Sequence, residues 1–329
     1  MPLAAARPSS AWQAAVRDAV RDPAELAALL ELPLAALGER GGGEFPLLVP
    51  RGFVARMRKR DPEDPLLRQV WPRAAEDAAV PGFGADPVLE QGLAAGGLLR
   101  KYPGRALLIA SGACPVHCRY CFRRAFPYGE QLAARGDWEP ALAALAATPG
   151  ITEAILSGGD PLSLANRRLG ELIAKLEHTA VETVRIHTRF PVVIPERVDR
   201  GLLAILERTR LRTVMVVHCN HANELDEPVA AALRELKRVC GALLNQSVLL
   251  AGVNDRAETL ADLSRRLFDC GVLPYYLHLL DPVAGAAHFD VDEAAGRRLI
   301  AALRERLPGY LVPRLVREMP GQLSKTLIA

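Results

Sequence analysis

Three cysteines crowded into one short stretch are the residues of this chain best suited to chemistry. Cys114, Cys118 and Cys121 form a C-x3-C-x2-C arrangement within CPVHCRYCFRR. Thiolates at these spacings can bind three irons of a [4Fe–4S] cluster and leave the fourth iron open to another ligand. A zinc site with His117 as fourth ligand, or unrelated buried thiols, would use the same stretch. The other three cysteines are scattered singly, so the pattern favours the open cluster.

The elements that must position these cysteines are short apolar runs alternating with amphipathic segments. Strands are expected at 106–111, 153–157, 183–188, 213–218, 243–250 and 274–280, and helices near 137–147, 167–178, 197–208, 226–239, 257–269 and 292–307. Pairs of about 30 residues indicate repeated βα units and a parallel sheet. We therefore expect an α/β fold, a partial (β/α)6 TIM-like barrel over residues 100–329, preceded by an N-terminal helical extension over residues 1–99.

Chemistry on a parallel barrel is carried at the carboxyl ends of its strands. The cysteines follow the first expected strand, and the turn Ser157-Gly158-Gly159-Asp160 ends the second. By itself that turn reads equally well as a simple strand-to-helix connection capped by Asp160. The later strands place further polar side chains at or near their ends: Thr188, Arg189, His218, Gln246 and Asp281.

Composition excludes several classes of protein. The 41 Lys and Arg residues against 38 Asp and Glu residues give a net charge of +3, so nucleic acid is not an expected partner. No apolar run approaches the roughly 20 residues of a membrane span, and the N-terminus lacks the pattern of a signal peptide. Clustered cysteines indicate a metal in a reducing compartment, so we expect a cytoplasmic protein without a membrane partner.

The three-cysteine spacing, with the aromatic Tyr120 before the last cysteine, resembles the radical S-adenosylmethionine superfamily. The resemblance implies that S-adenosylmethionine chelates the open iron of the [4Fe–4S] cluster through its methionine groups. Reduction by an electron donor then cleaves the cofactor to a 5′-deoxyadenosyl radical. Ser157, Gly158, Gly159 and Asp160 match the superfamily's second motif, which binds the methionine amino group.

Longer stretches narrow the resemblance to the lysine 2,3-aminomutase family. They are KYPGRALLIASGACPVHCRYCFRRAFPY, GGDPL, RIHTRFPVVIP, VMVVHCNHANELD, NQSVLLAGVND and PYYLHLLDPVAGAAHF. Within the family they look most like the bacterial branch that supplies β-lysine for modification of elongation factor P. The similarity extends from about Lys101 to Lys325 and, more loosely, over the N-terminal region.

The family resemblance implies a second cofactor, pyridoxal phosphate, held as a Schiff base on Lys325 in the stretch PGQLSK. Without the resemblance, Lys325 would read as a solvated lysine near a chain terminus. Other roles carry over by position. Tyr102, Arg105 and Gln246 match contacts of the pyridoxal phosphate, and His218 matches a residue beside the adenosyl group. Arg123 matches the arginine that binds the substrate carboxylate, and Asp281 and Glu318 match acids that bind the ε-ammonium group of lysine.

This sequence departs from the stand-alone lysine aminomutases at several positions. Glu318 replaces an aspartate, His278 replaces a tyrosine near the cofactor, and Arg256 replaces a zinc-binding cysteine. The lysine loop has Gln322, Leu323 and Ser324 in place of glycines. The first three departures agree better with the elongation factor P branch.

The resemblance thus implies an isomerase that converts L-α-lysine to β-lysine, with a functional link to elongation factor P and its lysyl ligase. An aminomutase for another amino acid, such as arginine, is an alternative because a longer cationic side chain would also require carboxylates. A non-catalytic metal-bound module that docks on a translation factor is an alternative from a different class.

Overall fold

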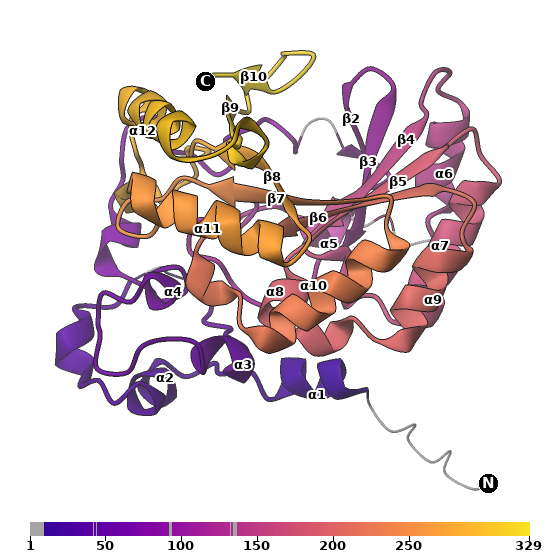
Figure 1. Ribbon diagram of the computed structural model, residues 1–329. Coiled ribbons are helices and arrows are strands. Elements are labelled where there is room, and N and C mark those ends of the chain that lie inside the picture. The colour runs from indigo at the N-terminus through magenta and orange to yellow at the C-terminus, as the bar shows by residue number, and fades with distance from the viewer. Residues whose placement is uncertain (1–9, 42, 44, 92–93, 132, 134–136) are drawn as a thin grey trace, which may run out of the picture.

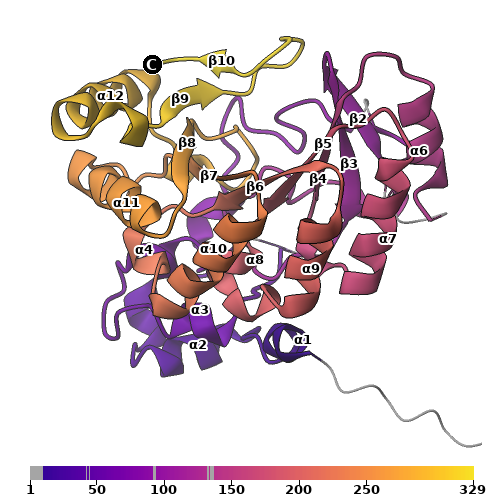
Figure 2. The ribbon, with the colours of Figure 1, turned by 45° about the vertical axis from the view of Figure 1, so that its right-hand side comes forward.

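The alternating segments fold into one curved sheet of ten strands, with the longer helices along its outer side (Figures 1 and 2). The computed structural model describes residues 10–329 except 42, 44, 92–93, 132 and 134–136, and at 94–95 and 130–131 it describes the backbone alone. Within this described part of the chain, no helix has both the length and the apolarity needed to cross a membrane.

The strands lie side by side in the order in which they occur along the chain. Neighbours from β3 to β9 are parallel, whereas the pairs at the two edges, β1–β2–β3 and β9–β10, are antiparallel. The strands are β1 (Ala94–Ala95), β2 (Leu98–Tyr102), β3 (Arg105–Ser111), β4 (Glu153–Gly158), β5 (Thr183–Thr188), β6 (Arg212–His218), β7 (Ala242–Val248), β8 (Leu273–His278), β9 (Arg314–Arg317) and β10 (Thr326–Leu327).

Each strand from β3 to β8 is followed by a helix of the outer layer. These helices are α6 (Glu139–Ala146), α7 (Asn166–Glu177), α9 (Arg200–Arg208), α10 (Glu227–Val239), α11 (Ala257–Asp269) and α12 (Glu293–Arg306). Aspartates accept hydrogen bonds from the first turns of three of them, and their positions are Asp199, Asp226 and Asp292. Six βα units in an open sheet confirm the predicted partial (β/α)6 barrel.

The remaining helices are short. They are α1 (Ala11–Arg17), α2 (Pro23–Leu29), α3 (Arg51–Val54), α4 (Pro65–Arg68), α5 (Tyr128–Gln131) and α8 (Phe190–Val193). Single 3-10 turns are η1 (Leu34–Leu37), η2 (Ala74–Asp77), η3 (Pro161–Ser163), η4 (Pro195–Arg197), η5 (Ala222–Glu224), η6 (Ala287–Phe289) and η7 (Gly309–Leu311). The helix expected at 197–208 begins only at Arg200, because η4 precedes it and Asp199 caps it.

Along the strands, side chains that are buried in the core alternate with side chains that face the inner side of the sheet. In β5, Val184 and Ile186 are buried in the main hydrophobic core, while Arg185 and His187 between them are only half-buried. In β7 the same alternation buries Leu243 and Asn245 and leaves Gln246 half-buried on the inner side. The inner side of the sheet is therefore polar, although its outer side carries the core.

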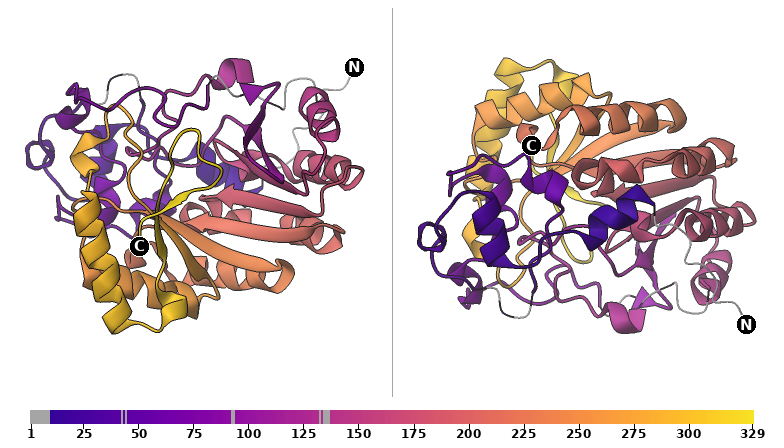
Figure 3. Two further views of the ribbon diagram at one scale, coloured as in Figure 1. Left: turned by 90° about the horizontal axis from the view of Figure 1, so that it is seen from above. Right: turned by 90° about the horizontal axis from the view of Figure 1, so that it is seen from below.

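The N-terminal helices α1 to α4 lie at one end of the sheet (Figure 1). Their apolar side chains, among them Trp12, Leu26 and Phe53, belong to the same hydrophobic cluster as those of β3 to β6. At the opposite end of the chain, β9 and β10 form a hairpin that crosses the middle of the molecule in the view from above (Figure 3). The two ends of the chain thus approach the sheet from different sides.

Candidate active site

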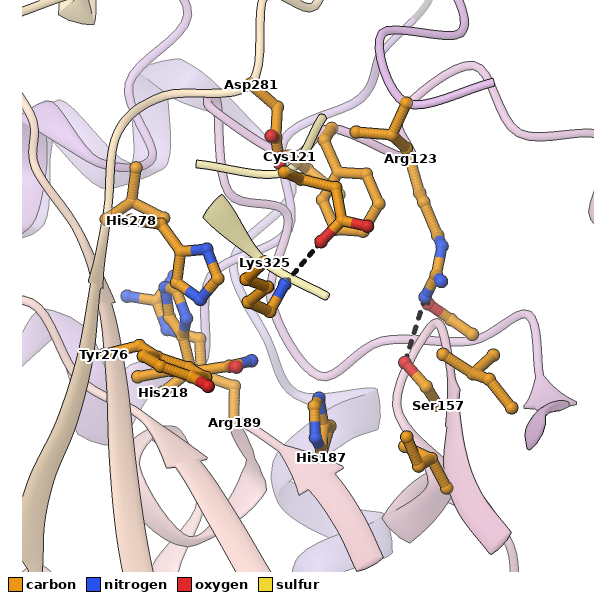
Figure 4. Close-up of a pocket in the computed structure, with 18 of the residues that line it drawn as sticks. Cys121, Arg123, Ser157, His187, Arg189, His218, Tyr276, His278, Asp281 and Lys325 are labelled. Atoms are coloured by element: carbon orange, nitrogen blue, oxygen red, sulfur yellow. Dashed lines mark hydrogen bonds and ion pairs between the residues drawn. The ribbon is translucent and has the colours of Figure 1, made fainter. Parts of the chain in front are cut away.

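A cavity of about 530 Å³ lies on the inner side of the sheet, toward the carboxyl ends of the parallel strands. All of the site residues predicted from the sequence line it: Tyr102, Arg105, Cys114, Cys118, Cys121, Arg123, Ser157, Gly158, Gly159, Asp160, His218, Gln246, Asp281, Glu318 and Lys325. Figure 4 shows how residues between Cys121 and the C-terminal hairpin meet there around Lys325. The fold therefore brings together residues up to about 220 positions apart in the sequence.

The cysteine loop follows β3, and the N-terminal region holds its backbone. The amide of His117 donates to the carbonyl of Leu48 at 3.0 Å, and the amide of Arg119 donates to the carbonyl of Gln69 at 2.9 Å. The Arg119 side chain is buried and donates to Glu76. Through these bonds, residues preceding the barrel fix the loop that carries the thiols.

The three thiols of this loop are free and line one wall of the cavity. Burial and the neighbouring Cys118 raise the pKa of Cys121 to about 11, and burial raises that of Cys114 as well. Buried thiols gathered in this way become thiolates when a metal compensates their charge. Three thiols on one short loop fit a cluster with one open iron.

The single-metal alternative is disfavoured because His117 is not among the described residues that line the cavity with the three thiols. Its Nδ1 atom lies 2.9 Å from the carbonyl oxygen of Pro46, and its ring stacks on Phe45. Among the described residues, no three Cys, His, Asp or Glu side chains converge as they would around one metal ion.

The turn after β4 requires glycine because it lies against the backbone of the cysteine loop. Gly158 has φ +117°, and a Cβ atom there would lie 2.4 Å from the carbonyl oxygen of Ser111. A Cβ atom on Gly159 would lie 2.6 Å from the carbonyl oxygen of Ala113. The turn and the loop are therefore fitted closely together.

Asp160, the last residue of the motif, is almost fully buried and accepts several hydrogen bonds. Its carboxylate accepts from the hydroxyl of Thr188 at 2.8 Å and from the backbone amides of Leu162 at 2.9 Å and Arg189 at 2.7 Å. Burial raises its pKa to about 6, although these bonds oppose the rise. Asp160 thereby connects the end of β4 to the end of β5.

Lys325 and Glu318 stand opposite each other in the C-terminal hairpin. The register pairs Arg317 with Thr326, so these two residues occupy the next positions toward the loop. The Nζ atom of Lys325 lies 2.6 Å from Oε2 of Glu318. The phenol of Tyr102 and the ammonium group of Lys101, at 3.4 Å, also bind this carboxylate. Although burial opposes it, the charge of Lys325 lowers the pKa of Glu318.

Asp281 lies on the loop that follows β8 and faces the same end of the cavity (Figure 4). Burial raises its pKa to about 7, and the charge of Lys325 counteracts part of that rise. The cavity thus contains two carboxyl groups close to one lysine, and only Glu318 is ion-paired with it.

Three neutral histidines line the wall formed by β5, β6 and β8. Burial lowers the pKa of His218 to about 3 and holds those of His187 and His278 well below the usual range. The Nε2 atom of His218 lies 2.9 Å from the Tyr120 phenol. The Nε2 atoms of the other two histidines have no hydrogen-bond partner among the residues that the structure describes.

Buried nitrogens that lack a partner among the described residues mark where a polar ligand would bind. Besides the two histidines, the Nε atoms of Arg105 and Arg189 are buried and unpartnered, and all four residues line the cavity. Arginine and neutral imidazole donors suit a phosphorylated cofactor. With Lys325 and the three thiols in the same cavity, the residues present fit both pyridoxal phosphate and an iron–sulfur cluster.

The sequence did not single out three further cavity residues: Glu90, Lys101 and His187. Glu90 forms a bidentate ion pair with Arg123, whose guanidinium also donates to the hydroxyl of Ser157 at 2.9 Å. The one sequence signal for His187 is its position in the strand: it follows the buried Ile186, so its side chain points to the inner side of the sheet. Nothing in the sequence near Glu90 distinguishes it from a solvated glutamate.

Comparisons with known proteins agree with this site. No family model matches the chain. The L-lysine 2,3-aminomutase of Escherichia coli is 47% identical over 319 residues, which cover 96% of this chain and 93% of that protein. The enzymes of the same name from Haemophilus influenzae and Clostridium subterminale are 44% and 32% identical, covering 97% and 96% of this chain and 95% and 77% of their own lengths.

Among solved structures, Streptococcus suis SuiB superposes with a TM-score of 0.50 at 16% identity. The match covers 67% of this chain and 50% of that one, and at this identity it shows a shared fold alone.

An open parallel barrel with a three-cysteine loop at its carboxyl edge defines a radical S-adenosylmethionine enzyme. The identities over nearly the whole chain are more specific. The chain belongs to the lysine 2,3-aminomutase family.

Proposed function

We propose that this protein is a lysine 2,3-aminomutase, which converts L-lysine to β-lysine. The reaction exchanges the amino group on Cα with a hydrogen on Cβ, so that no atom is gained or lost. One observation carries the proposal: the three thiols, Lys325 and the carboxyl groups of Asp281 and Glu318 line one cavity in a chain 47% identical to an enzyme of this name.

The cofactors are a [4Fe–4S] cluster, S-adenosylmethionine and pyridoxal phosphate. When bound, they supply a deoxyadenosyl radical and a π-system that holds an unpaired electron next to the migrating nitrogen. Cys114, Cys118 and Cys121 would hold the cluster. Ser157, Gly158, Gly159 and Asp160 would bind S-adenosylmethionine, with His218 beside its adenosyl group. The close fit of the β4 turn against the cysteine loop supports this assignment, because both motifs then face one ligand.

Lys325 would bind pyridoxal phosphate covalently, and Tyr102, Arg105 and Gln246 would contact it. The unpartnered Nε atom of Arg105 supports a phosphate-binding role, since a buried guanidinium nitrogen without an acceptor is costly. Glu318, 2.6 Å from the Lys325 amine, is placed to hold the proton that this amine releases or accepts when it exchanges with the substrate's amine.

The substrate would lie between Arg123 and the two acids, with its carboxylate on Arg123 and its ε-ammonium group on Asp281 and Glu318. A cavity lined by one arginine for the carboxylate and two acids for an ammonium group selects a cationic amino acid over alanine or glutamate. The neutral histidines and the surrounding apolar side chains exclude water from the reacting carbons.

Residues 1–99 would form the predicted extension and residues 100–329 the catalytic unit. We place the protein in the cytoplasm, where reduced thiols and an electron donor for the cluster are available. By resemblance, its product would pass to the lysyl ligase that modifies elongation factor P.

The test is an anaerobic assay of the reconstituted protein with L-lysine, pyridoxal phosphate, S-adenosylmethionine and a strong reductant, separating α- from β-lysine. Many turnovers of β-lysine per S-adenosylmethionine support the proposal. Deoxyadenosine formation without β-lysine would remove the substrate assignment and make arginine the next substrate to assay. Absence of both products would favour the metal-bound docking module.

A further inference from the structure

Glu90 enters the cavity from the N-terminal region, ahead of the barrel. The side chain of Asp86 accepts hydrogen bonds from the amides of Glu90 and Gln91, both at 2.9 Å, and so fixes the backbone of this segment. Glu90 is only 4% exposed, and it lines the cavity. A carboxylate buried to this degree requires cationic partners.

The first of those partners is Arg123. Its Nε atom lies 2.7 Å from Oε2 of Glu90, and its Nη2 atom lies 3.1 Å from Oε1, a fork that fixes the plane of the guanidinium. On its other side, Nη1 donates to the hydroxyl of Ser157 at 2.9 Å and to the carbonyl of Gly158 at 3.3 Å. Held at both edges, the guanidinium cannot rotate without breaking an ion pair or its bonds to the end of β4.

The second partner of Glu90 is Lys101, whose Nζ atom lies 3.0 Å from Oε1 of Glu90 and 3.4 Å from Oε1 of Glu318. Although burial raises it, the pKa of Glu90 falls to about 2 because Arg123 and Lys101 are both close. Glu90 is therefore ionised, and the connected charges of Glu90, Glu318, Arg123, Lys101 and Lys325, two negative and three positive, leave one positive charge for an incoming carboxylate.

We propose that Glu90 is a positioning residue, which orients Arg123 to receive the carboxylate of the amino acid substrate. The inference rests on the proposed function and adds to it a residue outside the barrel. It gives the N-terminal region a part in substrate recognition, because the carboxylate that aligns the arginine comes from that region. The second N–H of Nη2 is used by none of Glu90, Ser157 and Gly158, so a substrate carboxylate would accept from it while Glu90 stays in place.

The experiment compares L-lysine with L-lysinamide, which keeps both amines and lacks the carboxylate. The reconstituted holoenzyme and its Glu90→Gln variant are titrated with each compound by calorimetry, and kcat and KM for lysine are measured alongside. Glutamine has nearly the same shape but presents an NH2 group to one N–H of Arg123, so the fork is lost. In the Glu90→Gln variant we expect lysine to bind about tenfold more weakly and lysinamide to bind as before, so the preference for lysine falls about tenfold. The KM for lysine should rise by a similar factor.

Two further variants separate positioning from general damage. Asp64→Asn removes another fully buried carboxylate of the N-terminal region, outside the cavity, and should lower the melting temperature without altering the preference for lysine. Arg123→Gln should lose the preference, and the double variant Glu90→Gln/Arg123→Gln should lose no more than Arg123→Gln alone, because Glu90 acts through that arginine.

The opposite results are equally clear. Tighter lysine binding by Glu90→Gln would mean that Glu90 competes with the substrate for Arg123, and additive losses in the double variant would mean an independent role. Either result overturns the inference while leaving the proposed function intact. Failure of wild-type protein to form β-lysine concerns the proposed function alone, and a wild type without preference for lysine over lysinamide overturns the inference.

Discussion

Glu318 binds the ammonium group of Lys325 at 2.6 Å across the C-terminal hairpin. The proposed Schiff-base lysine and a proposed ligand of the substrate's ammonium group are thus partners before any ligand enters. Covalent attachment of pyridoxal phosphate to Lys325 would leave its nitrogen with at most one N–H, so Glu318 would have capacity to bind a second ammonium group. One carboxylate can therefore serve the enzyme's lysine first and the substrate's lysine afterwards.

Replacement of Lys325 should remove the pyridoxal phosphate chemistry and leave the iron–sulfur cluster in place. Lys325→Ala should abolish both β-lysine formation and the visible absorption of lysine-bound pyridoxal phosphate, since no other described lysine except Lys101 lines the cavity. Iron content should stay at the wild-type level because the cysteine loop is untouched. Lys237→Ala, on the outer helix α10, is the control. Retention of full activity by Lys325→Ala would refute the covalent role.

Replacement of Glu318 tests recognition of the distal ammonium group. Glu318→Gln should weaken lysine binding about tenfold or more, because a charged hydrogen-bond partner is lost inside a cavity. Norleucine, which has no ε-amine, should bind equally to variant and wild type. Calorimetry with the two ligands measures this difference, and the exposed Glu305→Gln is the control. Equal losses of affinity for lysine and norleucine would show that Glu318 does not bind the ε-ammonium group.

The Asp281 carboxyl should make lysine binding depend on pH. Burial raises its pKa to about 7, so it is neutral below that pH and cannot pair with an ammonium group. Since only the ionised form binds, lysine affinity should rise about tenfold between pH 6 and pH 8. Norleucine has the same α-amino group, so the pH dependence of its binding serves as the correction for titration of that group. Asp281→Asn should lose this pH dependence, and a wild-type affinity independent of pH would contradict the assignment.

Cys118 is the central residue of the cysteine loop. Cys118→Ala should abolish iron retention after reconstitution, and with it the formation of deoxyadenosine, because a cluster held by two thiolates is not stably bound. Iron analysis and product chromatography provide the readouts. Cys240→Ala changes a buried cysteine outside the cavity and should keep its iron. Iron retention by Cys118→Ala would remove the cluster assignment.

The glycine turn after β4 should tolerate no side chain. Gly158→Ala introduces a Cβ atom 2.4 Å from the carbonyl oxygen of Ser111 at a residue with φ +117°, so we expect a loss of about 2 kcal/mol or more in the free energy of unfolding. Denaturant unfolding measures the loss. Gly309→Ala, which meets no atom within 4 Å, should change stability little. Equal stability of the two variants would contradict the close approach.

Much of this fold could be read from the sequence because its information is local. Strands β3 to β8 are short segments rich in apolar residues, and most outer helices have a periodic apolar face, so the sequence located both to within a few residues. The rule that parallel strands carry chemistry at their carboxyl ends then indicated the edge at which to look for the site. Lys325 was found differently, since only family resemblance distinguished it from a solvated lysine.

The sequence by itself determined the order of the βα units, the three thiols and their spacing, and hence the class of chemistry. Tertiary structure alone decided which charges meet. The pairs Glu90–Arg123 and Glu318–Lys101 join residues 33 and 217 positions apart, and no periodicity encodes such contacts. Ion pairs of this kind depend on how the N-terminal region and the C-terminal hairpin approach the sheet. That approach is set by burial of apolar surface over the whole chain, which no single segment specifies.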